Sequence, residues 1–434
     1  MDILFSNITI LDENLEVKED QYVSVTDDKI SYIGSDAPEG QKGECCRKID
    51  GRGKLLMSGF FNAHAHSPMT LMRGYGENMV LQDWLQKKIF PFEDRLYPEA
   101  VYWGTLLAMA ESIRYGIVST SDMYYFCDDM ARAVIESGAK ANISRSIANP
   151  AGIDVDKLEG FGEMKAFYKE FNGAAEGRIK VDMSLHAEYT SNPKTAMALA
   201  DYARSLKDVV MHVHVSETEL EHRECIQRHG LTPAAYLEKT GIFDVPAIAA
   251  HCVYSDDDDL EIFKAKGVTV ATNPVSNMKL ASGICDVSRI LDKGINLAIG
   301  TDSVASNNSL DFIQEIKTMA IGCKIAAKDP TAVKPVEALR AATAGGAKAQ
   351  GRNDTGLLKV GNKADLIVLD ISGANMHPVH NLINNLVYSS SGSDVIMTLA
   401  DGKVLYEDGE YTTIDIEKTI WQAEHATSKI LERL

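Results

Sequence analysis

The sequence predicts an α/β protein: a (β/α)₈ barrel, or TIM barrel, with a small β-sandwich built from both ends of the chain. Two observations support this prediction. Eight segments with the apolar pattern of buried strands alternate with helical segments over roughly 300 residues, and a β-rich stretch lies on either side of them. With 434 residues the chain exceeds one compact core, so one large and one smaller unit are expected.

The two chain ends carry short alternating runs separated by turn residues, which is typical of β-hairpins. Neither end has a core of its own, so we expect residues 1–55 and 357–412 to form one sandwich together. Residues 413–434 have apolar positions at helical spacing and are predicted to form a C-terminal helix. The expected strands of the sandwich are 3–10, 22–26, 30–34, 47–50, 364–369, 395–400 and 403–406.

The region 56–356 is assigned to the barrel, with helices expected at 99–115, 194–205 and 232–240. An open, doubly wound sheet is the competing arrangement, but no G-x-G-x-x-G follows the first strand to support it. A barrel requires its functional residues at the carboxyl ends of the strands, and polar residues gather at those positions. The eight expected barrel strands are 55–64, 117–122, 140–146, 179–186, 209–215, 247–251, 268–272 and 296–300.

Histidines and an aspartate end four of these strands. His64 and His66 stand two residues apart and therefore face the same side of their strand. Zinc favours nitrogen and oxygen ligands, and a catalytic site keeps one position for water. We expect a single divalent ion, best matched by Zn²⁺, although Fe²⁺, Co²⁺ and Mn²⁺ use similar ligands. The expected metal ligands are His64, His66, His214 and Asp302.

The remaining polar residues at the strand ends suit proton transfer. Zinc supplies an activated water at neutral pH. His251, which is not needed as a ligand, can orient that water, and Asp302 can accept its proton. Glu217 follows the fifth strand and can pass a proton to a ring nitrogen of the substrate. His212 is expected to lie deeper than His214.

Two other zinc chemistries fit less well. Cytidine-type deaminases combine H-x-E with P-C-x-x-C; His186-Ala187-Glu188 reads H-x-E, but the cysteine half is missing. Two-metal hydrolases on such barrels commonly use a carboxylated lysine at the end of the fourth strand. Here that strand ends in His186, a candidate substrate contact, and Lys180 lies at its beginning. A single-metal site is therefore favoured.

Composition narrows the partners and the compartment. The formal net charge of −18 argues against nonspecific nucleic-acid binding, and no apolar stretch approaches the ~20 residues of a membrane span. The N-terminus does not resemble a signal peptide, and seven cysteines without framework spacing indicate a reducing cytoplasm. The C-terminal helix could pack on its own barrel or on a neighbour, so a homo-oligomer is possible.

The runs HAHSPMTLMRG, HVSE, AAHC, NPVSN and GTDSVASNN resemble the amidohydrolase superfamily. WLQKKIFPFEDR and ASNNS resemble its 5′-methylthioadenosine/S-adenosylhomocysteine deaminase group more specifically. The resemblance implies hydrolytic deamination of 5′-methylthioadenosine, S-adenosylhomocysteine, 5′-deoxyadenosine or adenosine to the inosine analogue and ammonia. It also implies that Glu217 and His251 handle protons beside the four metal ligands.

Further residues owe their roles to this resemblance alone. Glu93 matches the carboxylate that binds the ribose hydroxyls, and Trp84 an aromatic residue near the 5′ substituent. Where the family often has an arginine for the homocysteine carboxylate, this chain offers Lys157, which lacks the planar fork of arginine, so weaker discrimination for S-adenosylhomocysteine is expected. The other implied substrate contacts are Arg145, His186, Glu217 and Ser306.

Two alternatives remain. The first is an amidohydrolase that deaminates or dechlorinates a free heterocycle such as guanine, cytosine or a triazine, for which a ribose-binding Glu93 would have no use. The second is a non-catalytic barrel that serves in assembly. Such relatives typically lose metal ligands, whereas this chain keeps the whole set and Glu217.

Overall fold

The computed structural model describes residues 2–38 and 46–434 of the chain. Eight parallel strands follow one another in sequence order around a barrel. The first and last strands meet where Ala65 pairs with Asp302 in a parallel bridge and the Asp302 amide donates to His64 O at 3.0 Å. The strands are β6 (Phe60–Ala65), β7 (Ile117–Tyr124), β8 (Lys140–Ile147), β9 (Ile179–Leu185), β10 (Met211–Val215), β11 (Ala247–His251), β12 (Thr269–Thr272) and β13 (Leu297–Ile299).

One predicted barrel strand was wrong in its extent. The segment 55–64 is two strands: β5 (Lys54–Ser58) belongs to the other sheet, and β6 begins at Phe60. Gly59 lies between them. The chain passes so close to β7 there that a Cβ at this position would lie 2.5 Å from Val118 Cγ1. Both halves are buried, so the apolar run continues through the break and its pattern cannot reveal it.

The helices that surround the barrel begin and end at recognisable residues. The Asp256 side chain accepts the Asp259 amide at the start of α9, and Gly267 ends that helix in the left-handed conformation. The three helices expected from the sequence are present as α3, α6 and α8. The longer helices are α3 (Pro98–Arg114), α4 (Cys127–Ser137), α5 (Glu159–Phe171), α6 (Pro193–Arg204), α7 (Glu219–His229), α8 (Pro233–Lys239), α9 (Asp257–Lys266) and α13 (Phe312–Ala327). The shorter ones are α10 (Pro274–Lys279), α11 (Val287–Asp292), α12 (Val304–Asn307), α14 (Pro335–Arg340), α15 (Gly346–Ala349) and α16 (Leu382–Tyr388).

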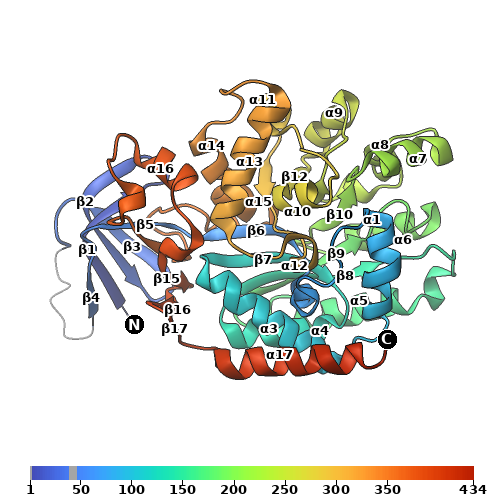
Figure 1. Cartoon of the computed structure of the whole chain (residues 1–434), viewed down its shortest axis with the longest axis horizontal. Helices are drawn as coiled ribbons and strands as arrows, with labels where there is room; N and C mark the ends of the chain where they lie inside the picture. Colours follow the sequence, from blue (N-terminus) through green and yellow to red (C-terminus); the bar gives the residue numbers. More distant parts are fainter. Residues whose placement is uncertain (1, 39–45) are drawn as a thin grey trace.

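A second, mixed sheet of nine strands combines both ends of the chain and lies beside the barrel (Figure 1). Strand β14 (Leu366–Asp370) pairs with β5, which joins the C-terminal strands to the N-terminal ones. Side chains from both ends, among them Phe5, Val25, Leu366 and Leu399, form one buried apolar cluster. The division into residues 1–55 with 357–412, 56–356 and 413–434 stays a prediction. The other strands are β1 (Asp2–Leu11), β2 (Val17–Thr26), β3 (Lys29–Gly34), β4 (Cys46–Asp50), β14 (Leu366–Asp370), β15 (Val395–Ala400), β16 (Lys403–Glu407) and β17 (Glu410–Tyr411).

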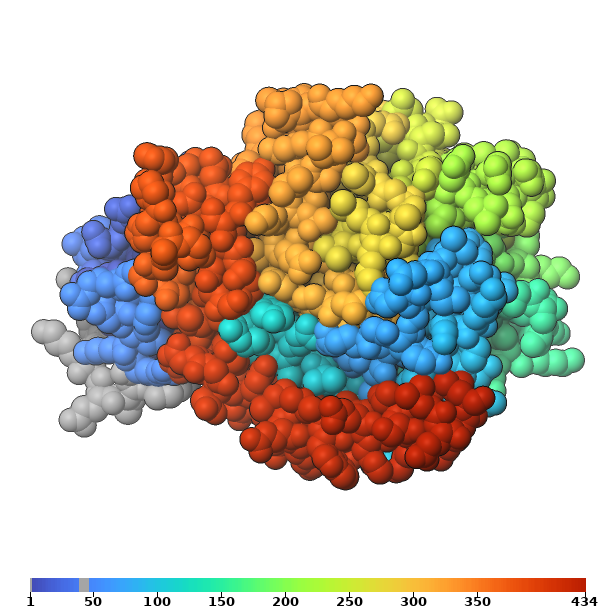
Figure 2. All heavy atoms as spheres, in the orientation of Figure 1, coloured from blue at the N-terminus to red at the C-terminus, as the bar shows by residue number. Residues whose placement is uncertain are grey.

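The C-terminal helix α17 (Ile416–Leu431) packs along α3 of its own barrel. Figure 2 shows its red surface lying directly against the light-blue atoms of the segment that contains α1 (Leu81–Trp84). Thr427 donates to Leu71 O at 3.3 Å, and Arg95 donates to Arg433 O at 3.1 Å. The helix therefore braces the segment that follows β6.

Within the described ranges, no helix is both long and apolar enough to cross a membrane. The five cysteines whose side chains are described are buried and carry free thiols.

Candidate active site

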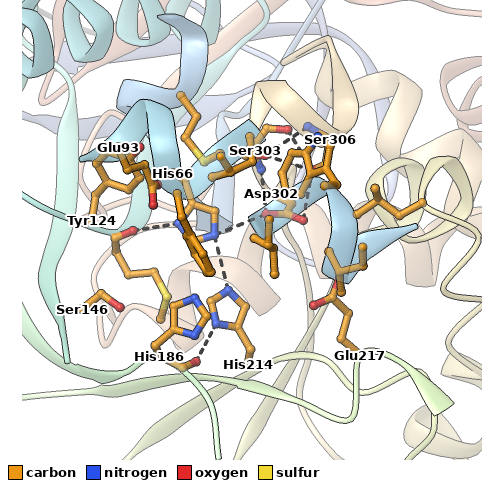
Figure 3. A pocket seen from close by; sticks show the side chains of 18 of the residues that line it. His66, Glu93, Tyr124, Ser146, His186, His214, Glu217, Asp302, Ser303 and Ser306 are labelled. Carbon is orange, nitrogen blue, oxygen red and sulfur yellow. Dashed lines mark hydrogen bonds and ion pairs between the residues drawn. The ribbon is translucent and has the colours of Figure 1, made fainter. Parts of the chain in front are cut away.

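The expected ligand residues converge at the carboxyl ends of the barrel strands, and Figure 3 shows three of them, His66, His214 and Asp302. His64 and His66 come from the end of β6, His214 from β10, and Asp302 from the turn after β13. Asp302 Oδ1 lies 3.6 Å from His64 Nε2 and 3.4 Å from His66 Nε2. Ligand atoms of the three histidines fall within 4.8 Å of one another.

The hydrogen bonds of His66 and His214 use Nδ1 and leave Nε2 available as a metal ligand. His66 Nδ1 lies 2.7 Å from Met123 O, and His214 Nδ1 lies 2.6 Å from His186 O. A carbonyl only accepts, so both N–H groups are on Nδ1, and the two Nε2 atoms face each other at 3.4 Å as lone pairs. His64 Nε2 is buried without a hydrogen-bond partner among the described residues. Such a set fits a divalent cation, and these residues are the candidate metal site.

Neighbouring groups hold the ligands in place. His212, which is more deeply buried than His214, lies behind His64 with its Nε2 2.9 Å from His64 Nδ1. Asp302 Oδ2 accepts from Ser276 at 2.5 Å and from Ser306 at 3.3 Å, while Oδ1 accepts from the Ser303 amide at 2.7 Å. Burial alone would raise the pKa of Asp302, but the close approach of His64 and the nearby His251 and His66 lower it below its ordinary value.

Glu217 and His251 form a second pair beside the ligands. His251 Nε2 lies 3.9 Å from Glu217 Oε2, and its Nδ1 lies 2.8 Å from Asn277 Oδ1, which fixes the orientation of the ring. Burial and the charge of Asp302 raise the pKa of Glu217 to about 8. Glu217 is therefore protonated at neutral pH and can donate a proton.

A cavity opens over these residues. In Figure 3, Glu93 and Tyr124 lie on one side of the His66–His214–Asp302 group and Glu217 on the other. Burial raises the pKa of Glu93 to about 7, and burial lowers that of His186 to about 4. The cavity is lined by His66, Met69, Leu81, Trp84, Leu85, Ile89, Phe90, Glu93, Met123, Tyr124, Tyr125, Ser146, His186, Tyr189, His214, Glu217, His251, Leu280, Asp302, Ser303 and Ser306.

Trp84 and Glu93 reach the cavity from an irregular helical segment after β6. Helix α1 ends at Trp84, a π-helical turn (Leu85–Ile89) follows, and α2 (Phe90–Glu93) ends at Glu93. Wider π-helical turns often occur at functional sites. The amphipathic pattern of this segment does not distinguish its cavity-facing residues from core or surface residues.

Other sequence-predicted residues lie elsewhere. Arg145 lines an adjoining hollow, and Lys157 is exposed on a short 3₁₀ turn (Val155–Lys157), outside the cavity. Glu188 of the H-x-E run is buried in ion pairs with Arg228 and His229. Lys180 donates to Gly351 O, and no lysine of the described chain lines the cavity. The arrangement supports a single-metal site.

Sequence reasoning missed several polar residues of the cavity. Tyr124 and Ser146 lie at the carboxyl ends of β7 and β8, so the rule that located His214 could have found them. Ser303 follows Asp302 directly. Tyr189 lies in the loop after β9, where no periodic pattern marks it.

The sequence is similar to those of several known proteins. Residues 55–405 match the sequence profile of the amidohydrolase family. A 5-methylthioadenosine/S-adenosylhomocysteine deaminase of Dictyoglomus thermophilum is 42% identical over 385 residues, 89% of each chain. A 5′-deoxyadenosine deaminase of Methanosarcina acetivorans is 40% identical over 437 residues, covering 100% of this chain and 99% of the relative.

A solved structure shows the same architecture. The crystal structure of an adenosine deaminase from Xanthomonas campestris with bound zinc superimposes with a TM-score of 0.93 at 32% identity. The match covers 99% of both chains.

Proposed function

The chain belongs to the amidohydrolase family, and on this basis we propose that it is a metal-dependent hydrolytic deaminase of adenosine-like nucleosides. One observation carries the proposal. A single cavity joins the His/Asp metal site and the Glu217–His251 pair to Glu93, a half-buried carboxylate suited to a ribose. The names of the full-length relatives support 5′-methylthioadenosine, S-adenosylhomocysteine, 5′-deoxyadenosine and adenosine as candidate substrates.

The proposed ion is Zn²⁺, as in the similar Xanthomonas structure. Its ligands would be His64, His66, His214 and Asp302. When bound, a zinc ion would make water a stronger nucleophile at neutral pH. Fe²⁺, Co²⁺ and Mn²⁺ suit the same nitrogen and oxygen ligands, so the metal content of the purified protein decides between them.

Glu217 and His251 are the proposed proton-transfer residues. Deamination adds water to the carbon that carries the amino group, protonates the adjacent ring nitrogen and releases ammonia. Protonated Glu217 can supply the ring proton, after which its carboxylate can take up the proton that water loses. His251, held by Asn277, can orient the attacking water by accepting a hydrogen bond at Nε2. Asp302, whose lowered pKa keeps it ionised, can accept from that water as well.

The opposite side of the cavity is proposed to bind the sugar and its 5′ substituent. The Glu93 carboxylate can accept from two ribose hydroxyls, a pair of charge-assisted hydrogen bonds. Trp84, which is only 5% exposed, offers an apolar face to the substituent. His186, neutral because of its lowered pKa, can contact the base, and Ser306 completes the wall beside Asp302. Arg145 and Lys157 lie outside this cavity and could meet only a substituent that extends beyond it.

The substrate is proposed to be a free small molecule, and the buried free thiols support a reducing, cytoplasmic location. A deaminase or dechlorinase of a free heterocycle is the alternative, and Glu93 distinguishes the two. For a nucleoside, Glu93→Gln removes charge-assisted hydrogen bonds and should lower kcat/KM by ~10- to 100-fold. For a free heterocycle such as guanine, the same variant should change little.

The assay compares ammonia release by the wild type and Glu93→Gln from 5′-methylthioadenosine and from guanine. Asp83→Asn is the matched control, because Asp83 is exposed on α1 and pairs with Lys87 outside the cavity. Nucleoside turnover that is insensitive to Glu93→Gln would contradict the ribose-binding role.

A further inference from the structure

A second hollow adjoins the cavity at its ribose side. The two share Phe90, Glu93 and Tyr125, so a group that extends past the ribose can enter the second one. The second hollow is lined by Phe90, Glu93, Asp94, Tyr125, Phe126, Arg145 and Glu163. It therefore has three carboxyl groups and one guanidinium group among its lining residues.

The guanidinium group is already engaged. Arg145 Nε donates to Glu163 Oε2 at 2.6 Å, and its Nη1 donates to Ser146 O at 2.5 Å. The guanidinium carbon also lies 4.8 Å from the centre of the Tyr125 ring. The arginine fork, which would otherwise pair with a carboxylate through two parallel hydrogen bonds, has its Nε occupied by Glu163.

We propose that Glu163 is a specificity-determining residue: by pairing with Arg145, it makes the second hollow favour neutral or cationic substituents over anionic ones. This inference rests on the proposed nucleoside deaminase function. An anionic substituent must displace Glu163 from Arg145 and then lie near Asp94, Glu93 and the released carboxylate. A cationic substituent meets carboxylates without displacing anything, and a neutral one leaves the ion pair intact.

Glu163 is suited to such a role because it is accessible to a ligand. Its side chain is 49% exposed, whereas that of Arg145 is 17% exposed. The carboxylate comes from α5, outside the barrel strands that hold the metal site. Replacing it should therefore change the selectivity of the hollow without disturbing the ligands.

The test measures kcat/KM for three nucleosides that differ in the charge of the 5′ substituent. These are 5′-methylthioadenosine (neutral), 5′-amino-5′-deoxyadenosine (cationic) and adenosine-5′-carboxylate (anionic). The wild type should use the anionic compound about tenfold less efficiently than the neutral one, or worse. Glu163→Gln should raise the anionic-to-neutral ratio by about tenfold, because Arg145 then becomes available.

Glu170→Gln is the matched control, since Glu170 is exposed on the same helix, the change removes the same charge, and the residue does not line the hollow. This control should keep the wild-type ratio. The inference is overturned if the variants still deaminate 5′-methylthioadenosine but Glu163→Gln leaves the anionic-to-neutral ratio unchanged. It is overturned equally if Glu170→Gln changes that ratio as much as Glu163→Gln does. Failure of the proposed function itself is different: no ammonia would form from any of the three nucleosides.

Discussion

At the scale of single residues, the site depends on backbone conformations that side chains rarely adopt. Ser216, His251 and Asp302 have φ values of 49°, 75° and 58°, in the left-handed region. Each such residue costs on the order of 1–3 kcal/mol and persists only where its surroundings hold it. Buried Glu221 does so next to Glu217, because its carboxylate accepts the amides of Ser216 at 3.0 Å and Glu217 at 2.7 Å. Of the three residues, His251 and Asp302 line the cavity, so the left-handed conformations lie at the site itself.

Glu217 provides the residue-scale prediction. Glu217→Gln should retain the metal but lose ~10²-fold or more in kcat, the usual scale for general acid–base catalysis. Because the pKa of Glu217 is raised to about 8, the wild-type rate should fall as the pH rises through that value and the acid ionises. A pH–rate profile of both proteins, with metal analysis, checks this. Glu219→Gln, an exposed glutamate on α7, is the control. Near-normal turnover by metal-replete Glu217→Gln would refute the role.

At the scale of elements, a buried ion pair joins the barrel to the mixed sheet. Lys140 is the first residue of β8. Its Nζ lies 2.5 Å from Asp365 Oδ2 and 2.8 Å from Asp401 Oδ1. Thr355 also donates to Asp365 at 2.7 Å. Burial would raise the pKa of Asp365, but the charge and hydrogen bond of Lys140 outweigh it and keep the pKa below its ordinary value.

Removing the lysine should therefore destabilise the junction. Lys140→Ala leaves the buried Asp365 carboxylate without its cation and should lower the free energy of unfolding by ~3–5 kcal/mol at pH 7. Because the folded pKa of Asp365 is lowered, this stabilisation is present above the ordinary carboxylate pKa and is lost as the pH falls through the folded value. Urea denaturation over a pH series measures both effects. Lys169→Ala, an exposed lysine on α5, should change little. A small loss of unfolding free energy that is the same in Lys140→Ala and Lys169→Ala would contradict the stabilising role of this ion pair.

The element scale also shows what the sequence could and could not predict. Barrel strands after the first were located closely because each is a buried run bounded by turns and helices. The break at Gly59 was not predicted, because the residues on both sides of it are buried and the apolar run shows no interruption there. His64, His214 and Asp302 were predictable from their strand ends, whereas Trp84 and Glu93 lie on an irregular helical segment whose pattern does not distinguish a cavity from a core. Only the family resemblance indicated their roles.

At the scale of the whole molecule, the cavity residues all come from the barrel part of the chain, and α17 lies outside them. Helix α17 contacts the segment after β6 through Leu71 and Arg95, so the chain end supports the wall that carries Trp84 and Glu93. The sequence left open whether this helix packs on its own barrel or on a neighbour, and its charge pattern does not decide between the two. In the structure it covers its own barrel.

Removing the metal should lower the thermal stability of the whole fold. The facing Nε2 atoms of His66 and His214, and the unpaired Nε2 of His64, gain their partner only when a cation is bound. Binding to the folded state alone stabilises it by ~4 kcal/mol at a metal concentration of 1,000 Kd. Chelated protein should therefore have a lower Tm, and added Zn²⁺ should restore it. A Tm that chelation does not change would contradict the metal site.

The most direct test of the central proposal is ammonia release from 5′-methylthioadenosine by purified protein of known metal content. We predict stoichiometric formation of ammonia and the inosine analogue by protein that holds one divalent ion per chain, and loss of both products after chelation. Metal-replete protein that releases no ammonia from 5′-methylthioadenosine, S-adenosylhomocysteine, 5′-deoxyadenosine or adenosine would contradict it.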